Sequence, residues 1–312
     1  MRIAIFGAGG AAGYFGARLA QSGEEVIFIA RGEHLSAIQR DGLHVESVAG
    51  DVTIRPAQAT SDPAEVGPVD AVILGVKTWQ VPGSAAAMRP LIGAETVVLP
   101  LQNGVEASDQ LAEVLGREHV LGGLAEIISF IAAPGRLRHQ GGPSSIALGE
   151  LDPRPSNRVE RLRDALDRAG IPVSVPANIQ AALWSKFLFV TPWGGLGAVT
   201  RAPAGVLRRI PETRRLVEAA MQEVRDVAVA RGVPLGDEDV ARALALLDSL
   251  PDSGTTSLQR DIMGGRPSEL EAWNGAAVRL GEAAGVPVPT HAFVYHTLLP
   301  LELRARGQER FG

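Results

Sequence analysis

The chain has 312 residues, 46% of them hydrophobic, with a formal net charge of −5 and no cysteine. This length fits two domains, and the lack of cysteine excludes disulfides, thiolate nucleophiles and thiolate metal ligands. No apolar run approaches the roughly 20 residues that span a bilayer, no basic block suggests nucleic acid, and the six histidines lack metal-ligand spacing. We therefore expect a cytoplasmic protein without a metal, membrane or nucleic-acid partner.

The first predicted elements are a buried strand at residues 3–6, a glycine-rich turn, and a helix that opens at Tyr14. In this order they form a site for the diphosphate of a dinucleotide. Gly7 permits the tight turn, Gly9 lets a phosphate approach the backbone, and Ala12 keeps helix and strand close. The alternative is a turn that binds nothing. The predicted cofactor-binding residues of this segment, which leads to the anion-binding helix N-terminus, are Gly7, Gly9, Gly10, Ala11 and Ala12.

The second predicted strand, at residues 25–30, indicates which dinucleotide is bound. Sites for NAD usually place an Asp or Glu near the end of this strand, where it holds the ribose hydroxyls. Here the strand ends at Arg31, and no carboxylate is present at its tip. Because a guanidinium can bind a 2′-phosphate that a carboxylate would repel, we predict NADP(H) rather than NAD(H). The alternative is that Arg31 is an ordinary exposed arginine.

Strand-like and helical stretches alternate through the first half of the chain, which favours a parallel sheet covered by helices. Buried strands are predicted at 69–76 and 96–101, and another begins at 119. Lys77 and Asn103 follow strand ends, where ligands bind in open α/β sheets. The remaining predicted elements are an antiparallel extension at 136–151, an amphipathic helix at 158–169 and a last strand at 171–175.

After Pro176 strand signals disappear and helical periodicity dominates. The predicted fold class is therefore α/β, with an N-terminal Rossmann-type doubly wound sheet and a C-terminal all-α domain. We expect an NADP-binding domain at 1–176 and a helical substrate and catalytic domain at 177–312, with the substrate in a cleft between them. The helical domain has enough apolar residues for a homodimer interface, although a buried core would give the same pattern. Helices are predicted at 212–231, 240–250 and 267–285, besides one that opens the domain.

Two segments of the second domain contain candidate catalytic residues. Lys186 is the one cation in the apolar helical stretch 181–190. It is either a general acid with a lowered pKa or a lysine at the rim of a buried helix. Ser268 is expected to cap the last predicted helix, with Glu269 in its first turn. Taken alone, Glu269 is better explained as a partner of the helix dipole than as a catalytic residue.

In order and spacing, these segments resemble the ketopantoate reductase (2-dehydropantoate 2-reductase) family over nearly the whole chain. The matching segments are Gly7-x-Gly9-x-x-Ala12-Gly13-Tyr14-Phe15-Gly16, Ala30-Arg31-Gly32, Gly75-Val76-Lys77-Thr78-Trp79-Gln80, Gln102-Asn103-Gly104-Val105, Trp184-x-Lys186, Ser257-Leu258-Gln259-x-Asp261 and Gly265-Arg266-x-x-Glu269-Leu270-x-x-Trp273-Asn274-Gly275.

The resemblance implies a role for each matching residue. Lys186 corresponds to the catalytic lysine that protonates the ketone oxygen, and Glu269 to the acidic residue that assists it and contacts the cofactor. Asn103 corresponds to the asparagine that contacts nicotinamide and substrate, and Lys77 to a lysine near the cofactor. Ser257 corresponds to the serine that binds the substrate carboxylate.

The chain departs from the family pattern one and two helical turns beyond the lysine. Family members commonly carry substrate-holding asparagines there, whereas this chain has Val190 and Gly194. An apolar wall would replace two amide groups, which suggests an altered pocket or a different 2-oxo acid. The alternative is that the substrate contacts have moved elsewhere.

The leading functional hypothesis is NADPH-dependent reduction of a 2-oxo acid to a 2-hydroxy acid, with ketopantoate, which would give pantoate, as the default substrate. A paralogous reductase for a more apolar 2-oxo acid is the second hypothesis. The third is a module that senses NADP(H) without catalysis, although such a module has no need of Lys186, Ser257 and Glu269 together.

Overall fold

The computed structural model describes residues 1–311. The chain forms two compact units: residues 1–102 with 107–179, and residues 103–106 with the chain from 180 onward. The short segment 103–106 thus belongs with the helical unit, although it directly follows a strand of the first unit.

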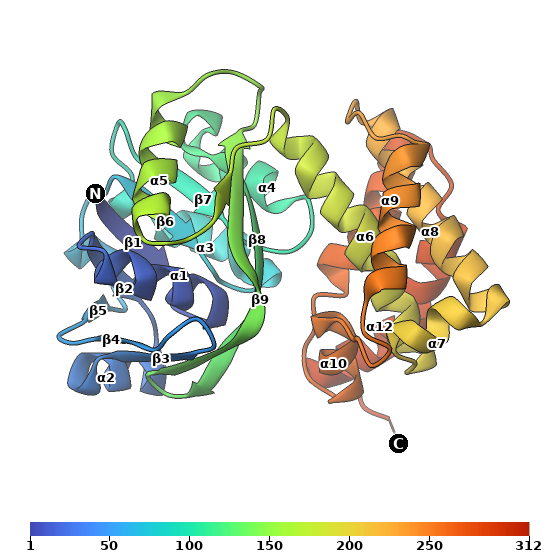
Figure 1. Cartoon of the computed structure of the whole chain (residues 1–312), viewed down its shortest axis with the longest axis horizontal. Coiled ribbons are helices and arrows are strands. Elements are labelled where there is room, and N and C mark those ends of the chain that lie inside the picture. The colour runs from blue at the N-terminus through green and yellow to red at the C-terminus, as the bar shows by residue number, and fades with distance from the viewer. Residues whose placement is uncertain (312) are drawn as a thin grey trace. The chain divides into compact units, whose positions relative to one another are not determined.

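The first unit contains a parallel five-stranded sheet in the order β5-β2-β1-β6-β7 (Figure 1). An isolated parallel bridge between Val98 and Val120 extends its β7 edge. This is the strand order of a dinucleotide-binding sheet, so the predicted fold class is confirmed. The strands are β1 (Arg2–Phe6), β2 (Glu25–Ile29), β5 (Gln58–Thr60), β6 (Ala71–Leu74) and β7 (Val97–Pro100).

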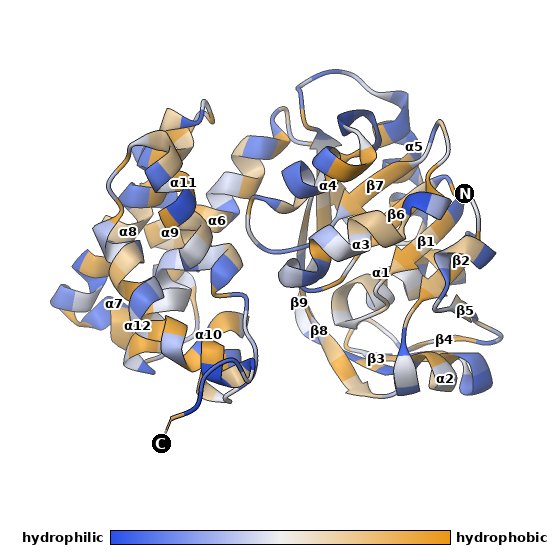
Figure 2. Ribbon diagram, turned by 180° about the vertical axis from the view of Figure 1, so that it is seen from behind, coloured by the Kyte–Doolittle hydropathy of each residue, from blue (hydrophilic) through white to orange (hydrophobic). Residues whose placement is uncertain are grey.

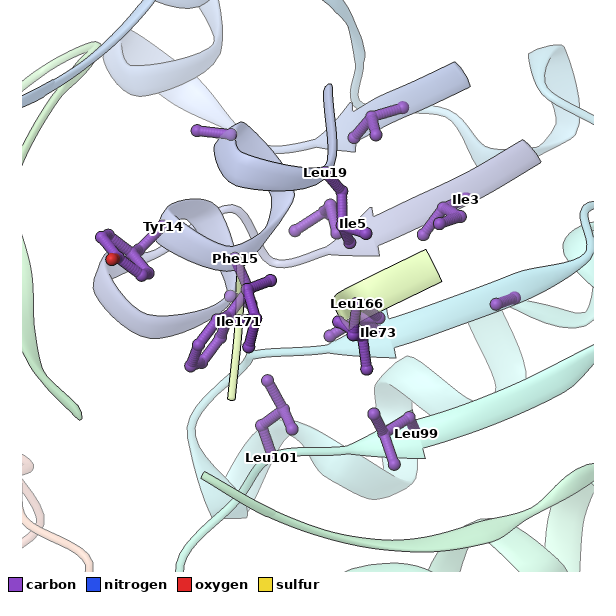
Figure 3. Close-up of a cluster of buried hydrophobic side chains, with 14 of the residues drawn as sticks. Ile3, Ile5, Tyr14, Phe15, Leu19, Ile73, Leu99, Leu101, Leu166 and Ile171 are labelled. Carbon is purple, nitrogen blue, oxygen red and sulfur yellow. The ribbon is translucent and has the colours of Figure 1, made fainter. Parts of the chain in front are cut away.

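Both faces of this sheet are buried because successive side chains of a strand point to opposite sides. In β1, Ile3 and Ile5 belong to one core cluster, and Ala4 and Phe6 belong to a second. Figure 3 shows Ile5 beside Leu19 of the first helix, within the cluster that also holds Ile3 and Phe15. Figure 2 shows β1, β6 and β7 as largely hydrophobic. Helices α1 (Gly10–Gln21) and α5 (Asn157–Arg168) contribute buried side chains to the first cluster. Helices α3 (Val81–Ala87) and α4 (Ala107–Leu115) contribute buried side chains to the second.

A second sheet follows the order β10-β9-β3-β4, with β8 paired antiparallel to β9. The antiparallel extension predicted at 136–151 is therefore confirmed as β9. The short strands near residues 43–60 and the helix before them did not emerge from the sequence, because these strands are brief and partly exposed. The elements are α2 (Gly32–Asp41), β3 (Leu43–Ser47), β4 (Val52–Ile54), β8 (Leu121–Ala133), β9 (Arg136–Glu150) and β10 (Val173–Ser174).

In the described part of the second unit, every regular element is a helix, as the loss of strand signals predicts. The long helix α6 contains Pro192 in its interior, where a proline removes one backbone hydrogen bond. The helices are α6 (Ile179–Thr200), α7 (Ala204–Arg209), α8 (Pro211–Ala230), α9 (Asp237–Ser249), α10 (Ser257–Met263), a π-helical turn η5 (Glu271–Gly275), α11 (Ala276–Ala284) and α12 (Pro289–Ala305). No helix within residues 1–311 is long and apolar enough to cross a membrane.

Two predicted boundaries are wrong. The first helix begins at Gly10 rather than Tyr14, because glycines and alanines at its start allow close packing instead of breaking it. The helix predicted at 267–285 is divided into the π-helical turn η5 and α11. Ser268 precedes this turn, and its hydroxyl accepts a hydrogen bond from the Leu270 amide (3.3 Å) while also bonding to Glu302.

Candidate active site

The glycine turn of the first unit has the backbone geometry of an anion-binding loop. Gly7 has φ +85°, a conformation that favours glycine. The amides of Gly7 and Ala8 donate to the carbonyl of Ile29 at 2.9 and 3.2 Å, which fixes the turn against β2. The first hydrogen bond of α1 runs from Gly13 to Gly9 (2.8 Å), so the amides of residues 10–12 precede the ladder.

Three glycines around this turn have different physical roles. A Cβ at Gly9 would come no closer than 3.8 Å to another residue, so the space beside it is open. A Cβ at Gly10 would lie 2.4 Å from the Ser129 carbonyl oxygen of β8, and one at Gly75 would lie 2.2 Å from Ala12 Cβ. Because Gly10 has no side chain, the β8 backbone can pack closely against the start of α1. The contact between Ala12 and Gly75 holds the same helix close to the end of β6.

His34 supports the turn, a role that the sequence did not indicate. The Gly135 amide donates to His34 Nδ1 (3.0 Å), so Nε2 carries the proton and donates to the Ala8 carbonyl (2.9 Å). One imidazole thus connects α2, the glycine turn and the β8–β9 connection. A histidine three residues after Arg31 was the available signal, but its partners are distant in sequence.

The two predicted cofactor-binding cations follow strand ends in the first unit. Arg31 is exposed and takes an extended conformation at the N-cap of α2. Lys77 is exposed after β6, and its ammonium lies 5.9 Å from the ring centroid of Trp79. No acidic residue occupies the first turn of α1. The glycine turn, the uncapped helix start and Arg31 therefore have the charge and space to suit a phosphorylated dinucleotide.

In the second unit, Asn103 and Glu269 are in direct contact. Asn103 Nδ2 donates to Glu269 Oε2 at 3.3 Å, although the residues are 166 positions apart. The next residue, Gly104, has φ +94°, and a Cβ there would lie 2.9 Å from the Ala272 carbonyl oxygen. A glycine at 104 therefore lets segment 103–106 pack against η5, and the packing brings the amide to the carboxylate.

A buried network holds the backbone immediately before Glu269. The Ser268 amide donates to both carboxylate oxygens of Glu302 at 3.1 and 3.0 Å, and its hydroxyl also donates to this carboxylate. Arg306 Nε donates to Glu302 (2.6 Å), and its guanidinium also donates to the Ser268 carbonyl (2.9 Å). Since Ser268 is fully buried and Glu269 is only 7% exposed, this network fixes the backbone from which the Glu269 side chain extends.

Glu271, two residues further on, has a different environment. It is exposed, pairs with Arg279, and accepts a hydrogen bond from the Tyr295 hydroxyl (2.6 Å). Burial, together with the bond to Glu271, raises the pKa of Tyr295 to about 12. The phenol therefore stays protonated at neutral pH and keeps Glu271 engaged, so the buried Glu269 is the better catalytic candidate.

Helix α6 carries Lys186, Val190 and Gly194 at intervals of four residues, which places them along one face. Lys186 and Val190 are half-buried, whereas Gly194 is buried. A Cβ at Gly194 would lie 2.8 Å from Trp273 Cζ3 and 3.0 Å from Thr256 Oγ1. Thr256 caps α10 by accepting the Gln259 amide (3.1 Å), and the half-buried Ser257 follows it as the first residue of α10.

Two family models match most of the chain. Residues 3–153 match "Ketopantoate reductase PanE/ApbA", and residues 178–302 match "Ketopantoate reductase PanE/ApbA C terminal". The chain belongs to the ketopantoate reductase family. It is 30% identical to a 2-dehydropantoate 2-reductase of a Nostoc species over 310 residues, which cover 98% of this chain and 96% of the relative.

Solved structures of ketopantoate reductases and related enzymes share the fold. A PanE/ApbA family ketopantoate reductase from Ralstonia eutropha has a TM-score of 0.89 at 33% identity, covering 98% of this chain and all of that one. A ternary structure of D-mandelate dehydrogenase with NADH and anilino(oxo)acetate has a TM-score of 0.88 at 26% identity, covering 98% and 99%.

The resemblance predicted from the motifs is therefore confirmed, and the chain is an oxidoreductase of the 2-dehydropantoate 2-reductase type. Within the described part of the chain, no group of three or more His, Asp or Glu residues could hold a metal ion. The individual roles of the site residues in this ketopantoate reductase family member stay predictions. Sequence reasoning missed Trp273 and Thr256 as neighbours of Gly194, although the Gly194-Gly195-Leu196-Gly197 stretch signals close packing.

Proposed function

We propose that the chain catalyses the NADPH-dependent reduction of a 2-oxo acid to a 2-hydroxy acid. Membership of the ketopantoate reductase family makes ketopantoate the first expected substrate, with pantoate as the product. The observation that carries the proposal is the hydrogen bond between Asn103 and Glu269. It joins two separate family motifs at one point of the second unit, which a module without catalysis does not require.

In this proposal, residues 1–176 form the NADP-binding domain and residues 177–312 the helical substrate and catalytic domain. The backbone from Gly7 to Ala12 holds the diphosphate, with Lys77 nearby on the same unit. Arg31 binds the 2′-phosphate through its guanidinium. NADPH, when bound, supplies a hydride to the substrate carbonyl carbon.

The remaining chemistry belongs to the side chains of this protein. Lys186 is the proposed general acid and donates a proton to the ketone oxygen as negative charge develops there. Glu269 is the proposed acidic partner in that proton transfer, and it is also expected to contact the cofactor. Asn103 donates to Glu269 and is expected to orient the nicotinamide and substrate. Ser257 binds the substrate carboxylate.

A second candidate is a reductase for a more apolar 2-oxo acid. Two observations favour it: Val190 presents hydrocarbon where the family commonly has an amide, and Gly194 has no side chain. Because polar groups that bind a substrate hydroxyl discriminate strongly, their loss alters the preferred tail of the substrate.

The direct test follows NADPH absorbance with ketopantoate and a panel of other 2-oxo acids. Turnover of at least one acid is expected, and binding of NADPH without any turnover would leave the sensing module as the explanation. The variant Arg31→Ala tests the cofactor assignment. It should raise the KM for NADPH and leave that for NADH nearly unchanged, whereas an unchanged KM for NADPH would remove Arg31 from the site.

A further inference from the structure

The face of α6 that carries Lys186 continues with Val190 and Gly194. Val190 lies one helical turn from Lys186 and is half-buried, so its isopropyl group is the first surface beyond the proposed general acid. This surface offers no hydrogen bond to a substrate hydroxyl.

One turn further, the indole of Trp273 occupies the position of the missing side chain at Gly194. Its Cζ3 lies 2.8 Å from where a Cβ would be, and Thr256 Oγ1 and Cγ2 lie at 3.0 and 3.1 Å. These distances are too short for any larger residue at 194 without movement of these groups. Gly194 and Trp273 are therefore a complementary pair, in which the ring closes the end of this face.

Trp273 comes from the same turn as the proposed catalytic carboxylate. Its amide donates to the Glu269 carbonyl (3.0 Å), and the side chain is 3% exposed. The ring is consequently held in place by the backbone that also carries Glu269. It is a fixed wall rather than a mobile side chain.

The indole N–H groups do not compensate for the missing amides. Nε1 of Trp273 and Nε1 of Trp193 are covered by protein atoms and have no hydrogen-bond partner within the described residues. Since both donors are shielded, neither is presented to a ligand beside Val190. The surface beside Val190 therefore gains no hydrogen-bond donor from either indole.

We propose that Trp273 is a specificity-determining residue and that the substrate is a 2-oxo acid with a compact hydrocarbon tail that lacks a hydroxyl group. The inference rests on the proposed function and narrows it. The Val190 side chain contacts the tail, and the Trp273 ring limits its length.

The decisive comparison uses ketopantoate and 3,3-dimethyl-2-oxobutanoate, which is the same molecule without its hydroxyl. A site built to bind the hydroxyl rejects the analogue lacking it by about 10⁴-fold. We expect the reverse order here, with kcat/KM about tenfold higher for the analogue, because desolvating an unpaired hydroxyl is unfavourable. A higher kcat/KM for ketopantoate would overturn the inference while leaving the proposed function intact. Turnover of neither acid, with NADPH bound, would overturn the inference alone if another 2-oxo acid of the panel is reduced, and would overturn the proposed function as well if none is.

Two variants locate the effect. Trp273→Leu should open the end of the face and raise the kcat/KM for phenylglyoxylate, relative to 3,3-dimethyl-2-oxobutanoate, by about tenfold. Trp184→Leu, which removes a buried tryptophan of α6 that packs on Phe187, is the matched control and should leave this ratio unchanged. Equal ratios in both variants would contradict the role of Trp273.

Val190→Asn provides a second test at a half-buried position. It should raise the kcat/KM for ketopantoate relative to its deoxy analogue by about tenfold, because one amide hydrogen bond is restored. An unchanged ratio in this variant, with an unchanged melting temperature, would place the tail elsewhere.

Discussion

Asn103 donates a 3.3 Å hydrogen bond to the buried carboxylate of Glu269, and the glycine that follows Asn103 makes the contact possible. The pair joins the segment after β7 to the turn before η5. A carboxylate that is largely buried costs free energy unless it is hydrogen-bonded, so the amide both stabilises Glu269 and restricts its orientation.

We expect energetic coupling between these two residues in catalysis. Asn103→Ala and Glu269→Ala should each lower kcat/KM, and the double variant should lose less than the sum, by about 0.5–3 kcal/mol. Glu271→Ala is the matched control, because this exposed acid two residues away is occupied by Arg279 and Tyr295, and should change kcat/KM little. Additive effects at 103 and 269 would mean that the hydrogen bond has no catalytic role.

Neighbouring glycines should separate cofactor binding from folding. Gly9→Ala places a methyl group in open space, so stability should change by less than about 0.5 kcal/mol, while the Kd for NADPH rises at least about tenfold because the diphosphate is obstructed. Gly10→Ala forces a methyl group against the Ser129 carbonyl and should destabilise the fold by about 1–3 kcal/mol. Calorimetric titration and denaturant unfolding measure the two effects. The opposite pattern would refute the assignment of Gly9.

Stability should fall in mild acid because of His291. Burial lowers the pKa of this imidazole, although the nearby Glu223 carboxylate and the Ala220 carbonyl oppose the shift. Below about pH 6.5 the unfolded chain therefore binds a proton that the folded chain does not, and this group costs up to about 1.4 kcal/mol of stability per pH unit until its folded-state pKa is reached.

Denaturant unfolding of His291→Gln, compared with the wild type between about pH 7.5 and 5.5, measures that contribution. The variant should be less stable at the higher pH but lose less stability on acidification. His296→Gln, at an exposed position of the same helix, should behave like the wild type. An identical pH dependence for His291→Gln would mean that folding does not lower the pKa of His291.

Local patterns were sufficient to predict the parallel sheet and the helical unit. The runs that became β1, β6 and β7 are apolar on both faces, which is the signature of a strand covered by helices on both sides. Strands β3 and β4 carry partly exposed side chains, and their stability depends on pairing with β9 and with each other. No local pattern contains that information.

The same distinction applies to the site. Gly7, Gly9 and Ala12 were predictable because the turn, its glycines and its helix are consecutive. The Trp273–Gly194 contact and the support of Ala8 by His34 link residues that are distant in sequence. They depend on how helices and loops pack, so a single sequence indicates the glycine but not its partner.

The central claim is that Lys186 donates the proton during reduction of the carbonyl, and the kcat of Lys186→Ala tests it most directly. With a 2-oxo acid that the wild type reduces, kcat should fall by at least about 10²-fold, while the Kd for NADPH, measured by calorimetry, stays unchanged. Lys186→Arg retains the charge but releases a proton poorly near neutral pH, so it should be similarly slow. A kcat for Lys186→Ala near that of the wild type, with the fold intact, would contradict the account.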